Sequence, residues 1–282
     1  MVLIADSGSS KTEWRLINEE TKVLSSVHTQ GLNPYFVSQG KIIEVLDRFI
    51  KPIALNVENV FFYGAGCGHH IKATEVKHAI VTSLNVKVCE VAGDILGTAR
   101  SLLKNESGIA CILGTGANSC VYDGKVITEN IPSLGYLLTD WGGGSVLGKD
   151  FLSLLLQEKL PAAINGDFFD TFKMKSTEIL DRIYNKPMPN RFLATFAPFL
   201  LKYAEEPQCR AVIISNFKRF FEYNVLCYAH KDPHVRFSGS IAHNFKKYLY
   251  EVADEMGISI DMVVQQPMEG LIQYHAVNIP SY

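Results

Sequence analysis

The chain has 282 residues, a length that predicts about two domains. Its hydrophobic fraction of 47% and charged fraction of 20% exclude a disordered chain, which would combine low hydrophobicity with high net charge. The 27 basic and 29 acidic residues give a net charge of −2, which provides neither the basic surplus of a nucleic-acid-binding protein nor a polybasic patch for a membrane surface.

The first part of the chain is predicted to be a mixed sheet with helices. Apolar runs and alternating patterns indicate strands, the first three of which form an antiparallel meander, and spacing of apolar residues by three and four indicates helices. The predicted strands are residues 2–5, 12–17, 22–28, 59–63 and 86–91, and the predicted helices are residues 36–50, 69–84 and 94–103.

The same order then restarts: strand, glycine loop, hairpin strands and α/β units. We place the boundary in the polar stretch at 105–108, which gives an N-terminal domain of residues 1–106 and a C-terminal domain of residues 107–282. We allow the last helix to pack back on the first domain. The predicted strands are residues 108–113, 119–122, 126–128, 235–237 and 258–260, and the predicted helical regions extend to about residue 229 and over residues 241–256 and 268–276.

Location and redox state follow from two further patterns. The chain contains no apolar run long enough for a membrane helix, and its N-terminus reaches Asp6 without a basic segment, so we expect neither a membrane span nor a signal peptide. The six cysteines are scattered, and several lie in apolar runs. We therefore expect reduced, buried thiols in a cytoplasmic protein.

The first motif is the loop after the first strand. Its small residues let backbone N–H groups approach and hold a phosphate. Lys11 and Thr12 resemble the end of a Walker A loop, but Ser10 replaces the required glycine and a strand follows instead of a helix. A phosphate-binding hairpin fits better, with Asp6 placed to hold Mg²⁺ through water, while the alternative is a plain β-turn. The predicted phosphate-binding residues are Ser7, Gly8, Ser9, Ser10, Lys11 and Thr12.

Two more glycine turns follow strands. The turn at residues 114–116 stands at the matching place in the second half, so the two hairpins together are predicted to clamp one polyphosphate. A strand-to-helix turn at residues 238–240 would let backbone approach a base or ribose, or is an ordinary helix start with Ser240 as N-cap. These predicted nucleotide-binding residues are Gly114, Thr115, Gly116, Ser238, Gly239 and Ser240.

Two acidic residues are further candidates for a functional site. Asp94 stands between a strand and a helix, where its carboxylate either takes a proton from a substrate hydroxyl or caps the helix. Asp140 precedes Trp141 and three consecutive glycines within residues 135–148. Apolar flanks favour an ordered functional segment over a flexible surface turn.

In this order, the motifs resemble the sugar-kinase branch of the actin-like ATPase superfamily, which also contains hexokinases, and more narrowly the BadF/BadG/BcrA/BcrD ATPase family, which includes the N-acetylglucosamine kinases. That family shows a D-G-G-G-T-K-T-like hairpin, a G-x-N sugar motif, a base Asp, a G-T-G-S/A-N hairpin, a G-x-x-L-G-D-E-G-S-G-like segment and a late glycine turn. The matching positions are residues 6–12, 31–33, 94, 114–118, 135–145 and 238–240. The resemblance covers essentially the whole chain.

The resemblance implies an α/β protein of two ribonuclease-H-like (actin-like ATPase) domains, with nucleotide and substrate in a cleft between them. It implies ATP and Mg²⁺ as cofactors, and a sugar whose hydroxyl is phosphorylated, the 6-OH of N-acetylglucosamine being the best guess. Asp94 would be the catalytic base. The residues assigned to sugar binding, or placed near the sugar, are Gly31, Asn33, Gly66, Cys67, Asn118 and Asp140.

The chain departs from the family pattern at Ser7 and Ser9, where glycine is usual, and at Trp141, where Glu is usual. The last departure leaves the sugar and the activity open. One alternative is an ATPase activator of 2-hydroxyacyl-CoA dehydratases, which needs accessible cysteines for a [4Fe–4S] cluster shared by a dimer. Another is a catalytically silent nucleotide- or sugar-binding regulator. We expect no nucleic acid or membrane partner, and a homodimer is compatible with the aromatic stretch at 217–228, which is more often helix core.

Overall fold

The computed structural model describes residues 1–228 and 235–278. The predicted helical region to about residue 229 is too long: its last helix ends at Asn224, because the N–H groups of Val225 and Leu226 both turn back to the Phe221 carbonyl. The chain divides into two compact units. The first comprises Met1–Ala110, Tyr122–Thr128 and the segment that begins at Gln266, and the second comprises Cys111–Val121 and Glu129–Gln265. The domain boundary between residues 106 and 107 stays a prediction.

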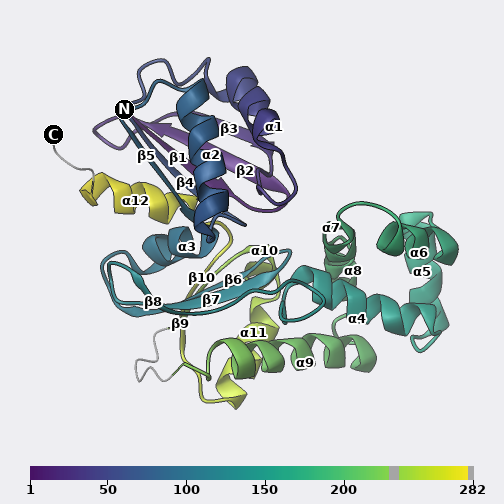
Figure 1. Ribbon diagram of the computed structural model, residues 1–282. Coiled ribbons are helices and arrows are strands. Elements are labelled where there is room, and N and C mark those ends of the chain that lie inside the picture. Colours follow the sequence, from purple (N-terminus) through teal and green to yellow (C-terminus); the bar gives the residue numbers. More distant parts are fainter. Residues whose placement is uncertain (229–234, 279–282) are drawn as a thin grey trace. The chain divides into compact units, whose positions relative to one another are not determined.

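The first unit contains a five-stranded sheet with the order β3-β2-β1-β4-β5 (Figure 1). Its strands are β1 (Val2–Ser7), β2 (Lys11–Ile17), β3 (Val23–Gln30), β4 (Asn59–Gly64) and β5 (Val88–Gly93). Its helices are α1 (Gln39–Val45), the π-helix η1 (Leu46–Ile50), α2 (His70–Ser83), α3 (Asp94–Leu103) and α12 (Met268–Asn278). β1 pairs antiparallel with β2, as β2 does with β3, which confirms the predicted meander. β1, β4 and β5 are parallel.

Both faces of this sheet are covered. Successive side chains of a strand point to opposite faces, so Leu3 and Ala5 pack with α1 and α2, whereas Val2 and Ile4 pack with α12. A strand that is buried on both faces needs an unbroken apolar run, which is the pattern that marked β1 in the sequence.

Helix α12 is docked by a buried polar group. The Nε2 atom of His275 lies 2.8 Å from the Tyr63 hydroxyl, and its ring stacks on Phe61 at 3.8 Å between centroids. Arg100 of α3 donates to the Tyr63 hydroxyl at 2.7 Å and to Glu90 of β5 at 2.5 Å. Burial and then the charge of Arg100 lower the pKa of His275 from 6.5 to about 3. The imidazole is therefore neutral in the folded chain.

The neutral His275 makes stability depend on pH. In the unfolded chain His275 takes up a proton below about pH 6.5, whereas in the folded chain it does so only near pH 3. Its contribution is therefore complete above pH 6.5 and is lost as the pH falls toward 3. We expect the free energy of unfolding, relative to a His275→Gln variant, to fall by about 1.4 kcal/mol per pH unit in this window.

Denaturant unfolding of both proteins at several pH values measures that difference. Asp6 has a raised pKa and acts with the opposite sign, but it is present in both proteins, so the comparison isolates His275. Parallel pH profiles for the two proteins would contradict the assignment of a neutral, docked imidazole.

A second five-stranded sheet has the order β10-β9-β6-β7-β8. Its strands are β6 (Gly108–Leu113), β7 (Ala117–Tyr122), β8 (Ile127–Ile131), β9 (Val235–Ser238) and β10 (Ile260–Val264). When its strands are counted from β6, this order is that of the first sheet. The repeat of element order that the sequence predicts is therefore confirmed as a repeat of topology.

The second unit adds helices between β8 and β9, where the first has only α1 and η1 between β3 and β4. Several of them pack around a cluster of phenylalanines centred on the buried Phe168. The helices of this unit are α4 (Gly144–Leu156), α5 (Ala162–Phe172), α6 (Ser176–Tyr184), α7 (Pro189–Ala194), α8 (Ala197–Lys202), α9 (Pro207–Asn224), α10 (Ser240–Asn244) and α11 (Lys246–Glu255).

Several predicted boundaries are wrong, and for three of them the structure shows the reason. The helix predicted at 36–50 begins only at Gln39, because Ser38 caps it and the preceding residues form a turn on the Asn33 carbonyl. The helix predicted at 241–256 is broken at Phe245, which is buried against Phe217. The strand predicted at 258–260 lies at Ile260–Val264, because Ile258 still bonds back to α11.

The aromatic stretch of α9 is mostly core, as predicted: Phe217, Phe220 and Phe221 are fully buried, whereas Tyr223 is exposed. Among the helices of the described ranges, none combines the length and apolar character that crossing a membrane requires.

Candidate active site

The first predicted phosphate site lies where β1 turns into β2. The Gly8 N–H donates to the Lys11 carbonyl at 3.0 Å, and Ser7 Oγ lies 2.8 Å from Thr12 Oγ1. Within the described residues, the backbone N–H groups of Ser9 and Ser10 have no hydrogen-bond acceptor. A closed turn that presents two unpaired N–H groups beside a lysine suits an anion, although phosphate binding itself stays a prediction.

The loop at 31–33 is bonded directly to this hairpin. The Gly31 N–H donates to the Ser10 carbonyl and the Leu32 N–H to Ser7 Oγ, both at 3.1 Å. A Cβ on Gly31 would lie only 2.5 Å from the carbonyl oxygens of Gly8 and Ser9. Glycine is therefore required here for close approach of two backbones, and the assignment of Gly31 to sugar binding stays a prediction.

Asn33 and Gly66, both predicted near the sugar, lie together. Asn33 Oδ1 accepts from the Tyr35 N–H at 3.0 Å, and a Cβ on Gly66 would stand 2.4 Å from the same oxygen. Cys67 follows and is buried. Burial, and next the nearby Asp94 carboxylate, raise the pKa of Cys67 to about 12. Its thiol therefore stays protonated and supplies no thiolate for catalysis or metal binding.

The base predicted at Asp94 lies at the same sheet edge. Ser7, Gly64 and Gly93 are aligned at the carboxyl ends of the parallel strands β1, β4 and β5, the edge where open α/β sheets bind ligands. Asp94 is the first residue of α3, and the N-cap position is Gly93, so the helix-cap alternative for Asp94 is wrong. Asp94 Oδ1 accepts from the Ile95 N–H at 2.9 Å.

Asp6, the predicted Mg²⁺ residue, lies in an acidic environment. Burial raises the pKa of Asp6 to about 7, and the carboxylates of Asp94 and Glu13 add to this, whereas Lys11 lowers it. Glu13 stands opposite Asp6 on β2 and is only 3% exposed. No sequence motif marks Glu13, although an acid in the alternating pattern of a half-buried strand could have indicated it.

These residues fit a magnesium ion that arrives with a nucleotide. Mg²⁺ binds oxygen, and in nucleotide sites it usually takes one or two carboxylates, several waters and substrate phosphates. Burial is the main cause of the raised Asp6 pKa, and the negative charges of Asp94 and Glu13, which add to it, are what a cation would relieve. Over residues 1–228 and 235–278, no group of three or more acidic, histidine or cysteine side chains could hold a metal by itself.

The second predicted hairpin, at 114–116, is held by the N-terminus of α4. The Gly144 N–H donates to the Gly114 carbonyl at 2.8 Å, and Ser145 donates to the Thr115 carbonyl from N at 2.9 Å and from Oγ at 2.7 Å. The N–H groups of Thr115 and Gly116 have no acceptor in the part of the chain that the structure describes. This hairpin therefore resembles the first in presenting N–H groups.

Asp140 is bound to this hairpin. Its carboxylate is buried, accepts from the Ser133 hydroxyl at 2.9 Å and from the backbone of Ala117, and lies against Gly116. Burial raises its pKa. Asn118 Oδ1 likewise accepts from the Ser119 N–H at 2.9 Å. Both side chains have structural partners, and their assignment to sugar stays a prediction.

The glycines after Trp141 form an ordered turn. Gly142, Gly143 and Gly144 are buried, so the flexible-turn alternative is wrong. The Arg219 guanidinium lies over the Trp141 ring, 5.0 Å from its centroid. The indole thus stacks with a cation of α9 at the position where the resembled family usually has a carboxylate.

The turn at 238–240 also requires glycine. Gly239 has φ of +125°, and a Cβ there would lie 2.2 Å from the Leu113 carbonyl oxygen. α10 begins at Ser240, and Gly239 occupies the N-cap position, so Ser240 is not the N-cap. A place beside adenosine stays a prediction for Ser238, Gly239 and Ser240.

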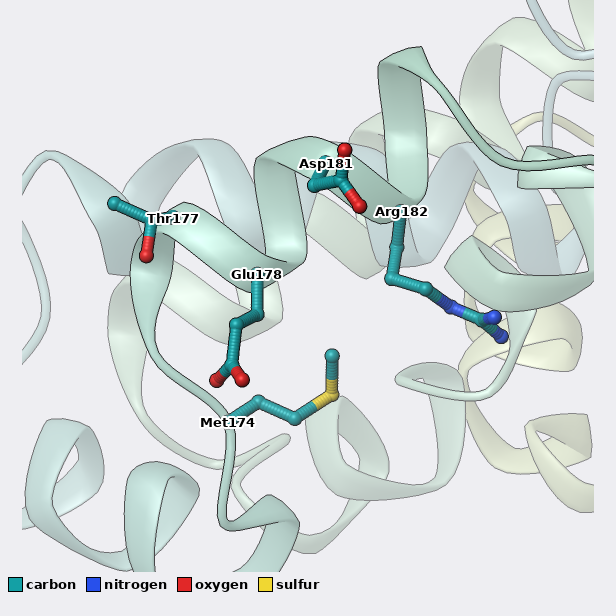
Figure 2. A pocket seen from close by; sticks show the side chains of 5 residues that line it. All are labelled: Met174, Thr177, Glu178, Asp181 and Arg182. Carbon is teal, nitrogen blue, oxygen red and sulfur yellow. The ribbon is translucent and has the colours of Figure 1, made fainter.

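Two hollows lie elsewhere. One, of 370 Å³ beside α6, is shown in Figure 2, and its lining includes Glu178, which already accepts from the Lys175 N–H at 2.6 Å. The other, of 400 Å³ beside α1 and α2, is lined by Gln39, His70, Ile71, Thr74, Glu75 and His78. Neither is lined by a predicted site residue.

The search of protein-family models finds no match, and no curated protein matches the chain. Solved structures do match. A candidate N-acetylglucosamine kinase from Porphyromonas gingivalis is 40% identical over 99% of both chains, with a TM-score of 0.95. A candidate N-acetylglucosamine kinase from Chromobacterium violaceum is 14% identical, covering 97% of this chain and 98% of its own, with a TM-score of 0.77. A ROK-family glucokinase from Streptomyces griseus, determined with glucose and AMPPNP, is 12% identical over 98% of both, with a TM-score of 0.59.

The last two likenesses show the fold: two sheets of repeated topology, as in the actin-like ATPases, which confirms the predicted α/β class. The 40% identity over the whole length goes further. The chain belongs to the sugar kinases of the actin-like ATPase superfamily.

Proposed function

We propose that the chain is an ATP-dependent kinase of the BadF/BadG/BcrA/BcrD branch that phosphorylates the 6-hydroxyl of an amino sugar, with N-acetylglucosamine as the best candidate. The observation that carries the proposal is one sheet edge. At the carboxyl ends of β1, β4 and β5, this chain has a hairpin with unpaired N–H groups, the pair Asn33 and Gly66, and Asp94. The chain also belongs to the sugar kinases.

The chemistry needs few groups. The oxygen of the sugar hydroxyl forms a bond to the γ-phosphorus of ATP, and Asp94 accepts the proton of that hydroxyl. The bond between the γ-phosphorus and the bridging oxygen of ADP breaks, and ADP leaves. N–H groups of Ser9 and Ser10 hold phosphate oxygens, and we assign the same role to Thr115 and Gly116. Asn33 orients the sugar. Phosphoryl transfer depends mostly on such positioning and on neutralising charge.

We assign the holding of Mg²⁺ to Asp6, through water. When bound, the ion would neutralise charge on the phosphates. We assign adenosine to the turn at 238–240 and further sugar contacts to Gly31, Cys67, Asn118 and Asp140. We also propose that the protein is cytoplasmic, which its six free cysteines support.

No observation favours the dehydratase activator. Cys67, Cys89, Cys111, Cys120 and Cys209 are buried, several of them in the apolar runs that predicted burial, and only Cys227 is exposed. A shared [4Fe–4S] cluster would need accessible thiols at a subunit interface. The silent regulator is favoured by one feature, the stacking of Trp141 under Arg219 in place of a carboxylate.

ADP release with Mg²⁺-ATP tests the proposal. The sugars to compare are N-acetylglucosamine, glucosamine, glucose, N-acetylmannosamine and N-acetylmuramic acid. We expect release that depends on N-acetylglucosamine, with the phosphate found on O6 by NMR. Release without sugar dependence would support the activator. ATP binding without release would support the regulator, and gain of activity in Trp141→Glu would then assign the silence to that position.

A further inference from the structure

The first hairpin makes a contact that no sequence motif indicates. The side chain of Gln266, in the segment between β10 and α12, lies between two charged groups of β2. An ammonium group only donates and a carboxylate only accepts, so the amide is assigned with its oxygen toward Lys11 and its nitrogen toward Glu13. In this orientation the oxygen accepts from Lys11 Nζ at 2.8 Å, and the nitrogen donates to Glu13 Oε2 at 2.9 Å. A primary amide offers both an acceptor for a cation and a donor for an anion, which makes it a suitable bridge between them.

Glu13 already has a cation of its own. Arg15 donates to Glu13 Oε1 from Nε at 2.8 Å and from Nη2 at 2.5 Å. Glu13 therefore does not need Lys11 to neutralise its charge. However, Lys11 and Glu13 are two residues apart on one strand, so their side chains leave the same face of the sheet. Without a spacer, Coulomb attraction would draw Lys11 Nζ onto Glu13 Oε2, the oxygen that Arg15 does not contact and that His28 Nε2 approaches only to 4.0 Å.

The backbone fixes Gln266 where this spacer is needed. Pro267 restricts the residue before it to extended conformations. Ser101 Oγ of α3 donates to the Pro267 carbonyl at 2.7 Å, and Gly270 packs closely on Ser101. The amide of Gln266 therefore projects from a segment that is anchored on α3, so little conformational freedom is lost when it binds Lys11.

We propose that Gln266 is a positioning residue that keeps the ammonium group of Lys11 available for the phosphates of ATP. The neutral amide of Gln266 holds Lys11 Nζ in position without neutralising it. The full positive charge of Lys11 therefore remains available to the nucleotide. The proposal rests on the proposed function in one respect, the assignment of the first hairpin to ATP. Gln266 itself touches Lys11 and Glu13, and no role in proton transfer is assigned to it.

The test measures the Kd of Mg²⁺-ATP by titration calorimetry on the full chain. In Gln266→Glu, the new carboxylate pairs with Lys11 and repels Glu13, and we expect ATP binding to weaken about tenfold or more. In Gln266→Ala, we expect a smaller loss, of about threefold. Gln265 is exposed like Gln266 but has no such contacts among the described residues, so Gln265→Ala is a matched control that should bind ATP like the wild type.

A double-mutant cycle separates positioning from a structural effect. If Gln266 acts through Lys11, then Gln266→Ala should change the Kd by less than about twofold when Lys11 is already Ala. An equal loss in both backgrounds, wild-type affinity in Gln266→Glu, or unchanged binding in Lys11→Ala would each overturn the inference. Because binding is measured without turnover, a chain that binds ATP but phosphorylates no sugar would refute the proposed function and leave this result standing.

Discussion

Asp94→Asn should fold normally and lose kcat by about 10²- to 10⁴-fold, the contribution typical of a positioned general base. The amide keeps the shape of the side chain and its bond from the Ile95 N–H, but it cannot accept the proton of the sugar hydroxyl. The nucleotide is assigned to other residues, so the KM for ATP should change little. Steady-state kinetics with ATP and with the sugar varied in turn measures both parameters.

The control for this variant is Asp47→Asn, which makes the same change on η1 at an exposed aspartate paired with Lys51. An exposed pair of this kind is worth at most about 1 kcal/mol, so the control should keep wild-type kinetics and near wild-type stability. Circular dichroism and the unfolding midpoint verify the fold of both proteins. Near-normal turnover in a correctly folded Asp94→Asn protein would show that Asp94 is not the base.

Gly31→Ala should damage both proposed substrate sites, for ATP and for sugar, at once. The new Cβ would lie 2.5 Å from the carbonyl oxygens of Gly8 and Ser9, and backbone on both sides can yield only if the hairpin and the 31–33 loop move apart. We expect a loss of unfolding free energy of about 1–3 kcal/mol, as for other overpacked sites. Displaced N–H groups and a displaced Asn33 should raise the KM for ATP and for the sugar together.

A second glycine-to-alanine substitution should have the opposite effect on the free energy of unfolding. Gly40 lies in α1 and is exposed, and a methyl group added to it would meet no atom within 4 Å. Gly40→Ala should therefore stabilise the protein by about 0.5–1 kcal/mol, because alanine loses less backbone entropy in a helix. Denaturant unfolding and kinetics of the two variants test the argument. Wild-type KM values in Gly31→Ala would show that the hairpin and the loop are not rigidly coupled.

Much of the site could be predicted because its signals are local. Two glycine-rich turns after apolar strands, a G-x-N loop and an acid at a strand-to-helix junction can each be recognised from a few neighbouring residues. The structure places Asn33, Gly66, Cys67 and Asp94 at one sheet edge because parallel strands end together. The order of strands along the chain was also predictable from local signals, because each strand has its own apolar or alternating pattern.

The partners of several site residues could not be predicted. Glu13 and Lys11 both contact Gln266, Asp140 lies against Gly116, and Trp141 stacks with Arg219. Each pair joins segments that are not neighbours along the chain and carries no periodic pattern. The same holds for the break at Phe245, where packing against Phe217 overrides a continuous helical pattern.

Local patterns in the chain therefore define the α/β class, the repeated order of strands, the two hairpins and the acid that begins α3, because strand, helix and turn preferences act over a few residues. Which charged and polar side chains contact one another is decided by the tertiary structure instead. The neutral docking of His275 against Tyr63, the spacing of Lys11 from Glu13 by Gln266 and the burial of Asp140 depend on desolvation and hydrogen bonds between distant segments. Those interactions exist only after the chain has folded, so no local pattern encodes them.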